Sequence, residues 1–212
     1  MAMPQPAPFR LPAVAMPQRP ARPLRFPLPP LEAMTARGVA LRGETPDDLG
    51  FLRQLYAAGR AVEMRLLNDT WDRETKRDFL EKQFSYQYLH HATYYGDGDF
   101  ALITLGGRPI GKLYLQWRLA GGLPPEVRVF DFLLLPALRD QGIGSLVLAA
   151  LLRLAALHNA AVSLHVEPIN PARRLYARFG FQPMGVEGAS GALLMGWRDG
   201  PLDPKPRLER ST

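Results

Sequence analysis

A glycine loop between two apolar segments is the feature that most restricts the fold of this chain. The segment Val127–Leu135 is largely apolar and predicts a central β-strand. The loop Arg139-Asp140-Gln141-Gly142-Ile143-Gly144 follows, and an apolar segment to about His158 predicts a buried helix. Free N–H groups in the first turn of a helix attract phosphate, aided by the helix dipole. The amides of Gln141 to Ser145 are therefore expected to bind a pyrophosphate, with Arg139 adding positive charge.

The loop alone does not identify a nucleotide site, because a Gly-x-Gly at a helix start is more often a turn. Two other phosphate motifs can be excluded. A Rossmann fingerprint needs a third glycine or alanine where this chain has Val147, and a P-loop needs a lysine that the loop does not contain. Gly142 and Gly144 nevertheless allow an anion to approach the backbone, since neither carries a Cβ.

The order of the remaining elements indicates one mixed sheet covered by helices. Hydrophobic periods and turn signals predict strands at Val39–Arg42, Phe100–Leu105, Pro109–Trp117, Val127–Leu135, Ala161–Glu167, Phe181–Val186 and Ala192–Trp197. They predict helices from a Thr45 N-cap to about Ala58, at Arg73–His90, from the glycine loop to about His158, and at Pro171–Phe179. This order predicts an α/β fold of the α+β type.

Composition changes near residues 35 and 200. Residues 1–35 are rich in proline, and we expect them to form an extended or disordered tail, with one domain at 36–199 and a flexible tail at 200–212. The prolines interrupt any apolar core of a signal peptide. The most apolar stretch, Ile143–Leu157, contains Arg153 and is shorter than the ~20 residues that a membrane span needs. We therefore expect a cytoplasmic protein with no membrane partner.

The formal charge of +6 and the pI of about 9.9 invite a nucleic-acid interpretation. However, residues 1–31 carry four arginines and no acid, residues 198–212 are slightly basic, and the middle of the chain is nearly neutral. A charge confined to the tails argues against nucleic-acid binding. The chain has no cysteine, and its four histidines show no metal-ligand spacing, so no metal is expected.

Two motifs resemble the GNAT superfamily of acyl-CoA N-acyltransferases. The segment Leu135–Gly144 is similar to its coenzyme A loop, Arg/Gln-x-x-Gly-x-Gly/Ala after a strand. The segment Leu164–Asn170, followed by Leu175-Tyr176 and Gly180-Phe181, resembles its Asn-x5-Tyr-x3-Gly-Phe segment. The two pieces occur in the expected order, and the similarity extends over roughly Val39–Trp197.

The resemblance implies the GNAT fold, whose mixed, mostly antiparallel central sheet is splayed between strands 4 and 5 and flanked by about four helices. It also implies acetyl-CoA as the acyl donor, with its pantetheine arm between the strands Val127–Leu135 and Ala161–Glu167. Backbone groups of Leu133, Leu134 and Leu135 would bond the pantetheine. A primary amine of a small molecule, peptide or protein would then attack the thioester directly.

The resemblance further implies roles for single residues. Tyr176 matches the tyrosine that protonates or hydrogen-bonds the coenzyme A sulfur, although such an aromatic could also be a core residue. Asn170 is expected to cap the helix that follows Pro171 and to lie near the pantetheine. The expected coenzyme-binding residues are Leu133, Leu134, Leu135, Arg139, Gln141, Gly142, Ile143, Gly144, Ser145, Asn170 and Tyr176.

The general base has three candidates. His165 lies five positions before Asn170, where ribosomal-protein alanine acetyltransferases place a catalytic glutamate, and an imidazole can accept a proton near neutral pH. His165 could equally be hydrogen-bonded within the sheet. Asp131 on the neighbouring strand is a second candidate, and Glu167, on the same face as His165, is a third.

Two other functions stay open at this point. One is a GNAT-fold module that binds acyl-CoA for regulation or assembly without catalysis. The other is an interaction protein whose functional part is the Pro-rich N-terminus. The sequence specifies neither the amine acceptor nor the acyl length, with acetyl as the default, and dimers are common in the superfamily, so a homodimer is also open.

Overall fold

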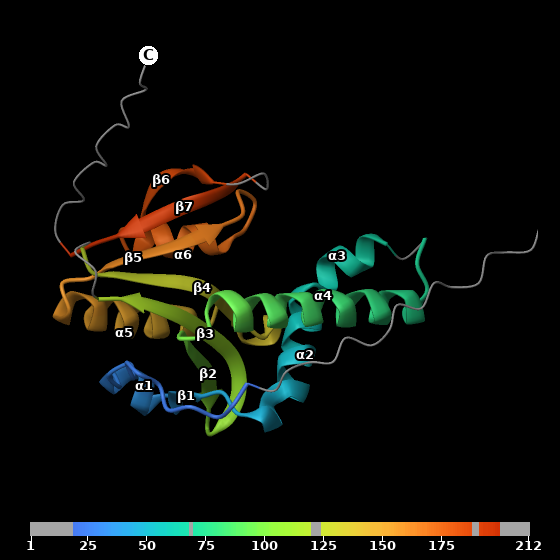
Figure 1. Ribbon diagram of the computed structural model, residues 1–212, viewed down its shortest axis with the longest axis horizontal. Helices are drawn as coiled ribbons and strands as arrows, with labels where there is room; N and C mark the ends of the chain where they lie inside the picture. The colour runs from blue at the N-terminus through green and yellow to red at the C-terminus, as the bar shows by residue number, and fades with distance from the viewer. Residues whose placement is uncertain (1–18, 68–69, 120–123, 188–190, 200–212) are drawn as a thin grey trace, which may run out of the picture.

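The computed structural model describes residues 19–67, 70–119, 124–187 and 191–199. Seven strands of these residues form one sheet in the order β1-β2-β3-β4-β5-β7-β6 (Figure 1). The strands are β1 (Val39–Gly43), β2 (Asp99–Leu105), β3 (Arg108–Arg118), β4 (Glu126–Leu134), β5 (Ala161–Val166), β6 (Gln182–Glu187) and β7 (Ala192–Trp197). All neighbouring pairs are antiparallel except β4 and β5, which run parallel. The predicted mixed, mostly antiparallel sheet is confirmed.

Six α-helices and two 3₁₀ turns connect the strands within the described residues. They are α1 (Glu32–Ala36), η1 (Pro46–Asp48), α2 (Leu49–Gly59), α3 (Ala61–Leu66), α4 (Arg73–Tyr94), η2 (Pro136–Leu138), α5 (Ile143–Leu157) and α6 (Ala172–Arg178). The sequence predicts α2, α4, α5 and α6 but neither α1 nor α3. Helices of five and six residues are too short to show a hydrophobic period of 3.6.

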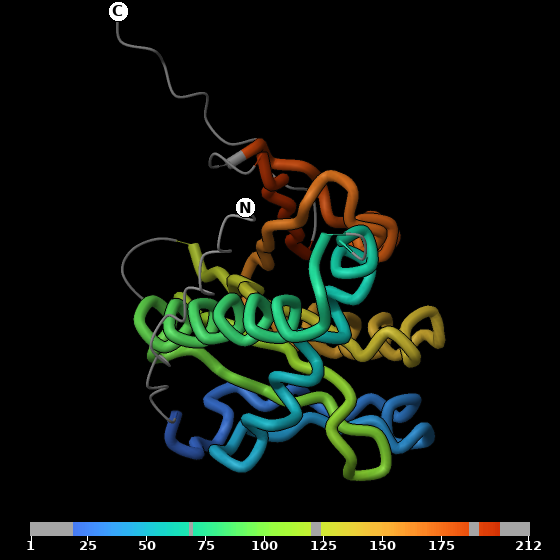
Figure 2. The backbone as a smooth tube through the Cα atoms, turned by 90° about the vertical axis from the view of Figure 1, so that its right-hand side faces the viewer, coloured from blue at the N-terminus to red at the C-terminus, as the bar shows by residue number. Residues whose placement is uncertain are grey.

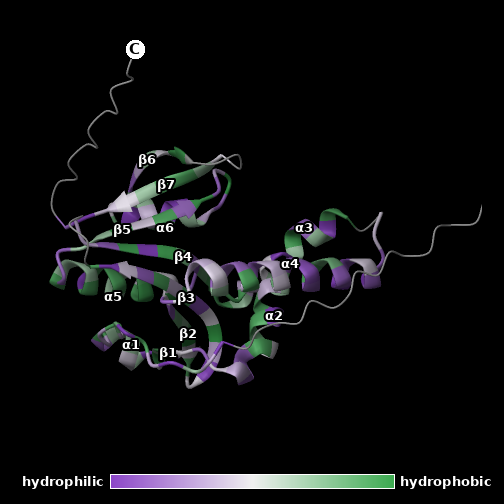
Figure 3. Cartoon of the chain, viewed as in Figure 1, coloured by the Kyte–Doolittle hydropathy of each residue, from purple (hydrophilic) through white to green (hydrophobic). Residues whose placement is uncertain are grey.

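Each face of the sheet has its own hydrophobic cluster. Figure 2 shows α4 on one side of the sheet and α5 on the other. The larger cluster holds eight buried residues of α5, which explains the hydrophobic character of this helix in Figure 3. The smaller cluster joins Leu52 and Tyr56 of α2 to Phe84 and Tyr88 of α4. The predicted buried helix after the glycine loop is thus α5.

The segment 19–31 lies against the sheet. Its residues 19–30 form neither helix nor strand and bend at Arg25 and Phe26, whose backbone amides donate to the buried carboxylate of Asp99 at 2.7 and 3.1 Å. The Phe26 ring packs on Trp117, with the ring centroids 4.4 Å apart. The sequence predicts an extended or disordered tail up to residue 35, and it does not reveal these contacts, which are far apart along the chain. Residues 1–18 and 200–212 lie outside the described residues.

Candidate active site

The two central strands separate along their length. β5 pairs with β4 only from Glu126–Ala161 to Val129–Leu164, whereas β4 continues to pair with β3 as far as Leu134 (Figure 1). Beyond Val129, the edge of β4 that faces β5 therefore has no strand partner among the described residues. This opening lies between the strands where the splay is expected.

A β-bulge changes the direction of β4 at the start of this opening. Tyr114 of β3 is paired with Asp131, and the next residue, Leu115, is paired with Val129, so Phe130 is the extra residue. The Phe130 ring stacks on Tyr95 at 4.0 Å, on the side of the sheet that carries α4. A bulge re-aims side chains locally. Here it brings Asp131 to the same side, where its carboxylate meets the ammonium of Lys112 at 2.5 Å.

The three leucines expected to bond the pantetheine have different surroundings. The amide of Leu135 donates to the carbonyl of Ile110 at 2.9 Å, so β3 already uses it. Backbone groups alternate between the two edges of an antiparallel strand, which directs those of Leu134 to the open edge. There the Leu134 carbonyl accepts from Nε of Arg139 at 3.1 Å. The Leu133 side chain lies instead against Gly59 at the end of α2.

The glycine loop leads directly into α5. Gly142 precedes the helix and has a φ of 79°, a left-handed conformation that glycine adopts without strain. The first amide of this turn with a backbone acceptor among the described residues is that of Leu146, which donates to Gly142 at 3.1 Å. The amides from Gln141 to Ser145 are thus available to an anion. The side chain of Gln141 is bonded to the carbonyl of Ala137 at 2.8 Å.

A second arginine lies beside the loop, and sequence reasoning missed it. A guanidinium nitrogen of Arg37 is 3.4 Å from the point that a Cβ on Gly142 would occupy. Arg37 follows α1, is exposed, and has no ion pair among the residues that the structure describes. Packing of Met34 into the larger cluster holds α1 in place. No local sequence signal connects Arg37 to Gly142, because the contact exists only after the sheet has formed.

Tyr176 of α6 is 6% exposed and belongs to the larger hydrophobic cluster, with its ring 5.6 Å from that of Phe181. Burial raises the pKa of Tyr176 to about 12, and the negative charge of Asp131 contributes to the same shift to a smaller extent. Within the described residues its hydroxyl has no hydrogen-bond partner. Tyr176 is therefore a core aromatic and also a neutral phenol that can donate a proton.

The candidate bases lie in different environments. Asp131 is paired with Lys112 and is close enough to Tyr176 to affect the pKa of its hydroxyl. His165 is exposed, and its Nδ1 lies 3.1 Å from the guanidinium of Arg128. Glu167 is exposed beyond the end of β5. Of the three, Asp131 is the one that the structure brings into electrostatic contact with Tyr176.

A buried histidine beside these groups was not predicted. His91 of α4 is 6% exposed, and its ring lies 5.1 Å from that of Phe130. Burial lowers the pKa of His91 to about 4, although the charge of Asp131 opposes this shift. His91 is therefore neutral at pH 7. Its neighbour His90 is exposed, whereas His91 follows Phe84 and Tyr88 at spacings of seven and three residues, which places it on the buried face of α4.

Asn170 lies at the start of α6 as the sequence predicts. Its side-chain oxygen accepts from the amide of Ala172 at 2.9 Å, which satisfies one of the free amides of the first helical turn. The side chain is exposed. Asn170 therefore precedes the N-cap residue Pro171 and bonds to the first amide of α6, and its expected contact with the pantetheine stays a prediction.

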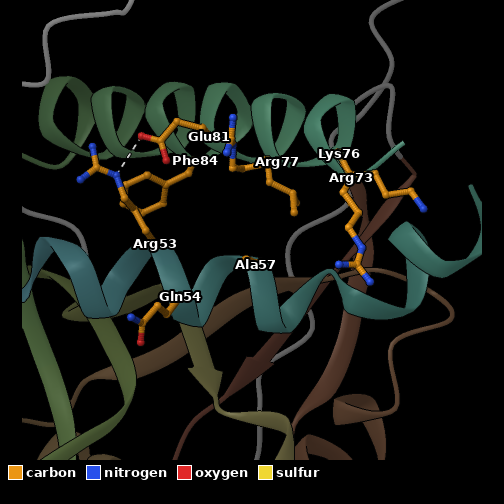
Figure 4. Close-up of a pocket in the computed structure, with 9 residues that line it drawn as sticks. Arg53, Gln54, Ala57, Arg73, Lys76, Arg77, Glu81 and Phe84 are labelled. Carbon is orange, nitrogen blue, oxygen red and sulfur yellow. Dashed lines mark hydrogen bonds and ion pairs between the residues drawn. The ribbon is translucent and has the colours of Figure 1, made fainter. Parts of the chain in front are cut away.

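A groove between α2 and α4 has a volume of about 420 Å³ (Figure 4). Its walls carry basic side chains, and Arg53 of one helix pairs with Glu81 of the other at 2.8 Å. All of its lining residues belong to these two helices, so it includes none of the predicted site residues.

Among the described residues, no three His, Cys, Asp or Glu side chains form a metal-binding group. No helix in the same part of the chain is both long and apolar enough to cross a membrane.

Comparison with known proteins identifies the class that this geometry defines. Residues 63–181 match the model of the acetyltransferase (GNAT) family. The match covers more than half of the 212 residues, and the chain therefore belongs to the GNAT acetyltransferase family. A search of the curated proteins gave no match.

Solved structures show the same fold. PaiA N-acetyltransferase from Thermoplasma acidophilum, in complex with coenzyme A, is similar with a TM-score of 0.54 and 16% identity over 76% of this chain and 99% of that chain. Naa50 from Arabidopsis thaliana, in complex with a bisubstrate analogue, has a TM-score of 0.50 and a sequence identity of 17%. The match covers 76% of this chain and 99% of Naa50. An HPA2-related acetyltransferase from Corynebacterium glutamicum has a TM-score of 0.55 and a sequence identity of 17%. The match covers 77% of this chain and 98% of that chain. At such identities the likeness establishes the fold.

Proposed function

We propose that this protein is an N-acetyltransferase that moves an acetyl group from acetyl-CoA to a primary amine of a small molecule, peptide or protein. The observation that carries the proposal is the junction of the open β4 edge with the glycine loop. The unpaired edge ends at Leu134, and Arg139, Gly142 and the first turn of α5 follow at once. Family membership and the coenzyme A complex of a protein with this fold support the assignment.

The residues at this junction fit the chemistry of the donor. Coenzyme A joins an extended, hydrogen-bonding pantetheine arm to a pyrophosphate. The open edge of β4 offers backbone groups to the arm, and the amides at the start of α5 suit the pyrophosphate. Arg37 beside Gly142 and Arg139 within the loop add positive charge. Arg37 thus joins the residues expected to hold the phosphates.

The transfer needs one proton acceptor and one proton donor. The amine nitrogen bonds to the thioester carbonyl carbon, the carbon–sulfur bond breaks, the nitrogen loses a proton and the sulfur gains one. Tyr176 is the proposed donor, because burial keeps its hydroxyl protonated at pH 7. Asp131 is the proposed acceptor, directly or through water, since it is an anion paired with Lys112 close to Tyr176. His165 is the second candidate, because imidazole is the most common general base in enzymes.

Thermal unfolding with acetyl-CoA, and with ATP and NAD as controls, tests the donor. A ligand at about 100 times its dissociation constant stabilises the native state by ~2.7 kcal/mol, which raises the Tm by a few degrees. We expect this shift with acetyl-CoA alone. An equal shift with all three ligands, or no shift with any of them, would show that the loop does not recognise coenzyme A.

A further inference from the structure

Arg19, in the N-terminal segment 19–31, is enclosed by side chains of the folded domain. Its guanidinium carbon lies 3.9 Å from the ring centroid of Tyr88 and 4.0 Å from that of Phe100. Its Nε donates to one carboxylate oxygen of Glu44 at 3.0 Å, and its Nη2 donates to the other at 3.2 Å. The hydroxyl of Tyr114 hydrogen-bonds to the same carboxylate. Aromatic faces and a two-pronged carboxylate are the features that select a guanidinium over an ammonium.

This cage, formed by Glu44, Tyr88, Phe100 and Tyr114, is buried. The side chains of Arg19 and Glu44 are 12% and 5% exposed, and Tyr114 is 1% exposed. Burial raises the pKa of Glu44, while the charge of Arg19 acts in the opposite direction. A carboxylate in such a place requires a paired cation, because an uncompensated buried charge is strongly destabilising. Arg19, which precedes the first strand in the chain, supplies this cation.

The cage adjoins the charged pair on the same face of the sheet. Tyr114 is the register partner of Asp131 across β3 and β4. The ammonium of Lys112 lies 5.0 Å from the ring centroid of Tyr114 and 2.5 Å from the Asp131 carboxylate. Its charge also acts on Glu44. Two carboxylates, Glu44 and Asp131, therefore lie within the influence of one lysine, and Arg19 supplies the second cation.

We propose that the cage of Glu44, Tyr88, Phe100 and Tyr114 is a guanidinium-binding site filled by Arg19, and that Arg19 is thereby a positioning residue for the Lys112–Asp131 pair. By pairing with Glu44, Arg19 leaves Lys112 to hold Asp131 at the opening between β4 and β5. The second half of this inference rests on the proposed function, in which Asp131 accepts the amine proton. The N-terminal segment is then a part of the active-site wall.

Chemical rescue of Arg19→Ala in the full chain tests the site. We expect the variant to unfold at a lower temperature than the wild type, and we expect millimolar methylguanidinium to restore part of the loss. Methylammonium, which lacks the planar fork, should restore less. The matched control is Arg22→Ala, because Arg22 is exposed and its guanidinium bonds only to the Gly96 carbonyl, at 3.2 Å, among the described residues. An Arg19→Ala variant with wild-type Tm and no response to methylguanidinium would overturn the guanidinium site.

Kinetics test the positioning role separately. We expect Arg19→Ala to lower kcat at least about tenfold, a loss of about 1.4 kcal/mol in transition-state stabilisation, with little change in the KM for acetyl-CoA. Methylguanidinium should raise kcat again. Should Arg19→Ala fold poorly, the double variant Arg19→Met, Glu44→Gln removes both charges and should fold. Its kcat should lie close to that of the wild type, since no carboxylate then competes for Lys112, and a tenfold loss in this folded variant would overturn the positioning role.

The outcomes separate the inference from the proposed function. An unchanged kcat in a folded Arg19→Ala variant would overturn the positioning role, even if methylguanidinium restores the Tm. Absence of acetyl transfer by the wild type would instead refute the proposed function. The guanidinium site would still be supported by the rescue of thermal stability.

Discussion

Arg37 and Gly142, which are distant in sequence, meet at the start of α5. The guanidinium of Arg37 lies 3.4 Å from the point where a Cβ on Gly142 would be, and it has no ion pair among the described residues. Nε of Arg139, the arginine within the loop, is bonded to the Leu134 carbonyl. The cation available beside Gly142 is therefore Arg37, which precedes the first strand.

Replacing Arg37 with alanine should weaken coenzyme A binding without affecting the fold. Loss of one exposed charge-assisted contact to phosphate is worth about 1 kcal/mol, or roughly fivefold in Kd. Isothermal titration with coenzyme A and with pantetheine, which has no phosphate, checks this. Only the coenzyme A affinity should fall. Arg108→Ala, an exposed arginine on the β2–β3 hairpin, is the control. Equal loss for both ligands would place Arg37 away from the phosphates.

Replacing Gly142 with aspartate should abolish coenzyme A binding. The left-handed φ of 79° costs a non-glycine residue roughly 1 kcal/mol, and the new carboxylate would both repel phosphate and pair with Arg37. Gly107→Asp is a matched control, since Gly107 also has a φ of 79° but open space around it. The two variants should lose similar stability by thermal unfolding, and only the first should fail to bind in titration. Retained binding by Gly142→Asp would refute the loop assignment.

His91 should make the native state less stable in acid. Its pKa is about 6.5 when unfolded and about 4 in the native state, so the unfolded chain takes up the proton first as the pH falls. Stability is therefore full above pH 6.5 and decreases toward pH 4, with a loss of about 2 kcal/mol between pH 7 and pH 5. Chemical denaturation across this range checks the slope. The raised pKa of Glu44 acts in the opposite sense.

His91→Gln provides the comparison for that slope. Glutamine fills similar space without titrating, so the difference between the two stability profiles isolates the contribution of His91 from that of Glu44. We expect the variant to lose less stability than the wild type on going from pH 7 to pH 5. Parallel profiles would mean that His91 is accessible to protons in the native state.

The sequence predicts the elements whose patterns are local. The apolar periods of β4 and α5, the Gly106-Gly107 hairpin and the capping Asn170 can all be recognised within a few residues. Two motifs in the right order predict that the chain is a member of the GNAT family. Membership in turn implies the splay between β4 and β5. The sequence also assigns Arg139 to the phosphates; its Nε bonds to the backbone of Leu134, and its contact with the phosphates stays a prediction.

Contacts between distant residues could not be predicted in the same way. The pairing of Arg19 with Glu44, and the approach of Arg37 to Gly142, depend on how the N-terminal segment crosses the sheet. A Pro-rich composition indicates extension but does not specify which surface the extended chain lies against. The bulge at Phe130 also has no local signal, although it determines where Asp131 points.

Release of the coenzyme A thiol from acetyl-CoA, measured with a panel of amines and peptides, tests acetyl transfer most directly. We predict amine-dependent release by the wild type. Tyr176→Phe should lower kcat about 100-fold or more while coenzyme A binding and the Tm stay close to those of the wild type, because only the proton donor is lost. Release that requires no amine would mean thioester hydrolysis, and equal kcat values for the two proteins would show that Tyr176 is not the proton donor; either result would contradict the account. Absence of release with every amine would favour a module that binds coenzyme A without transferring the acetyl group.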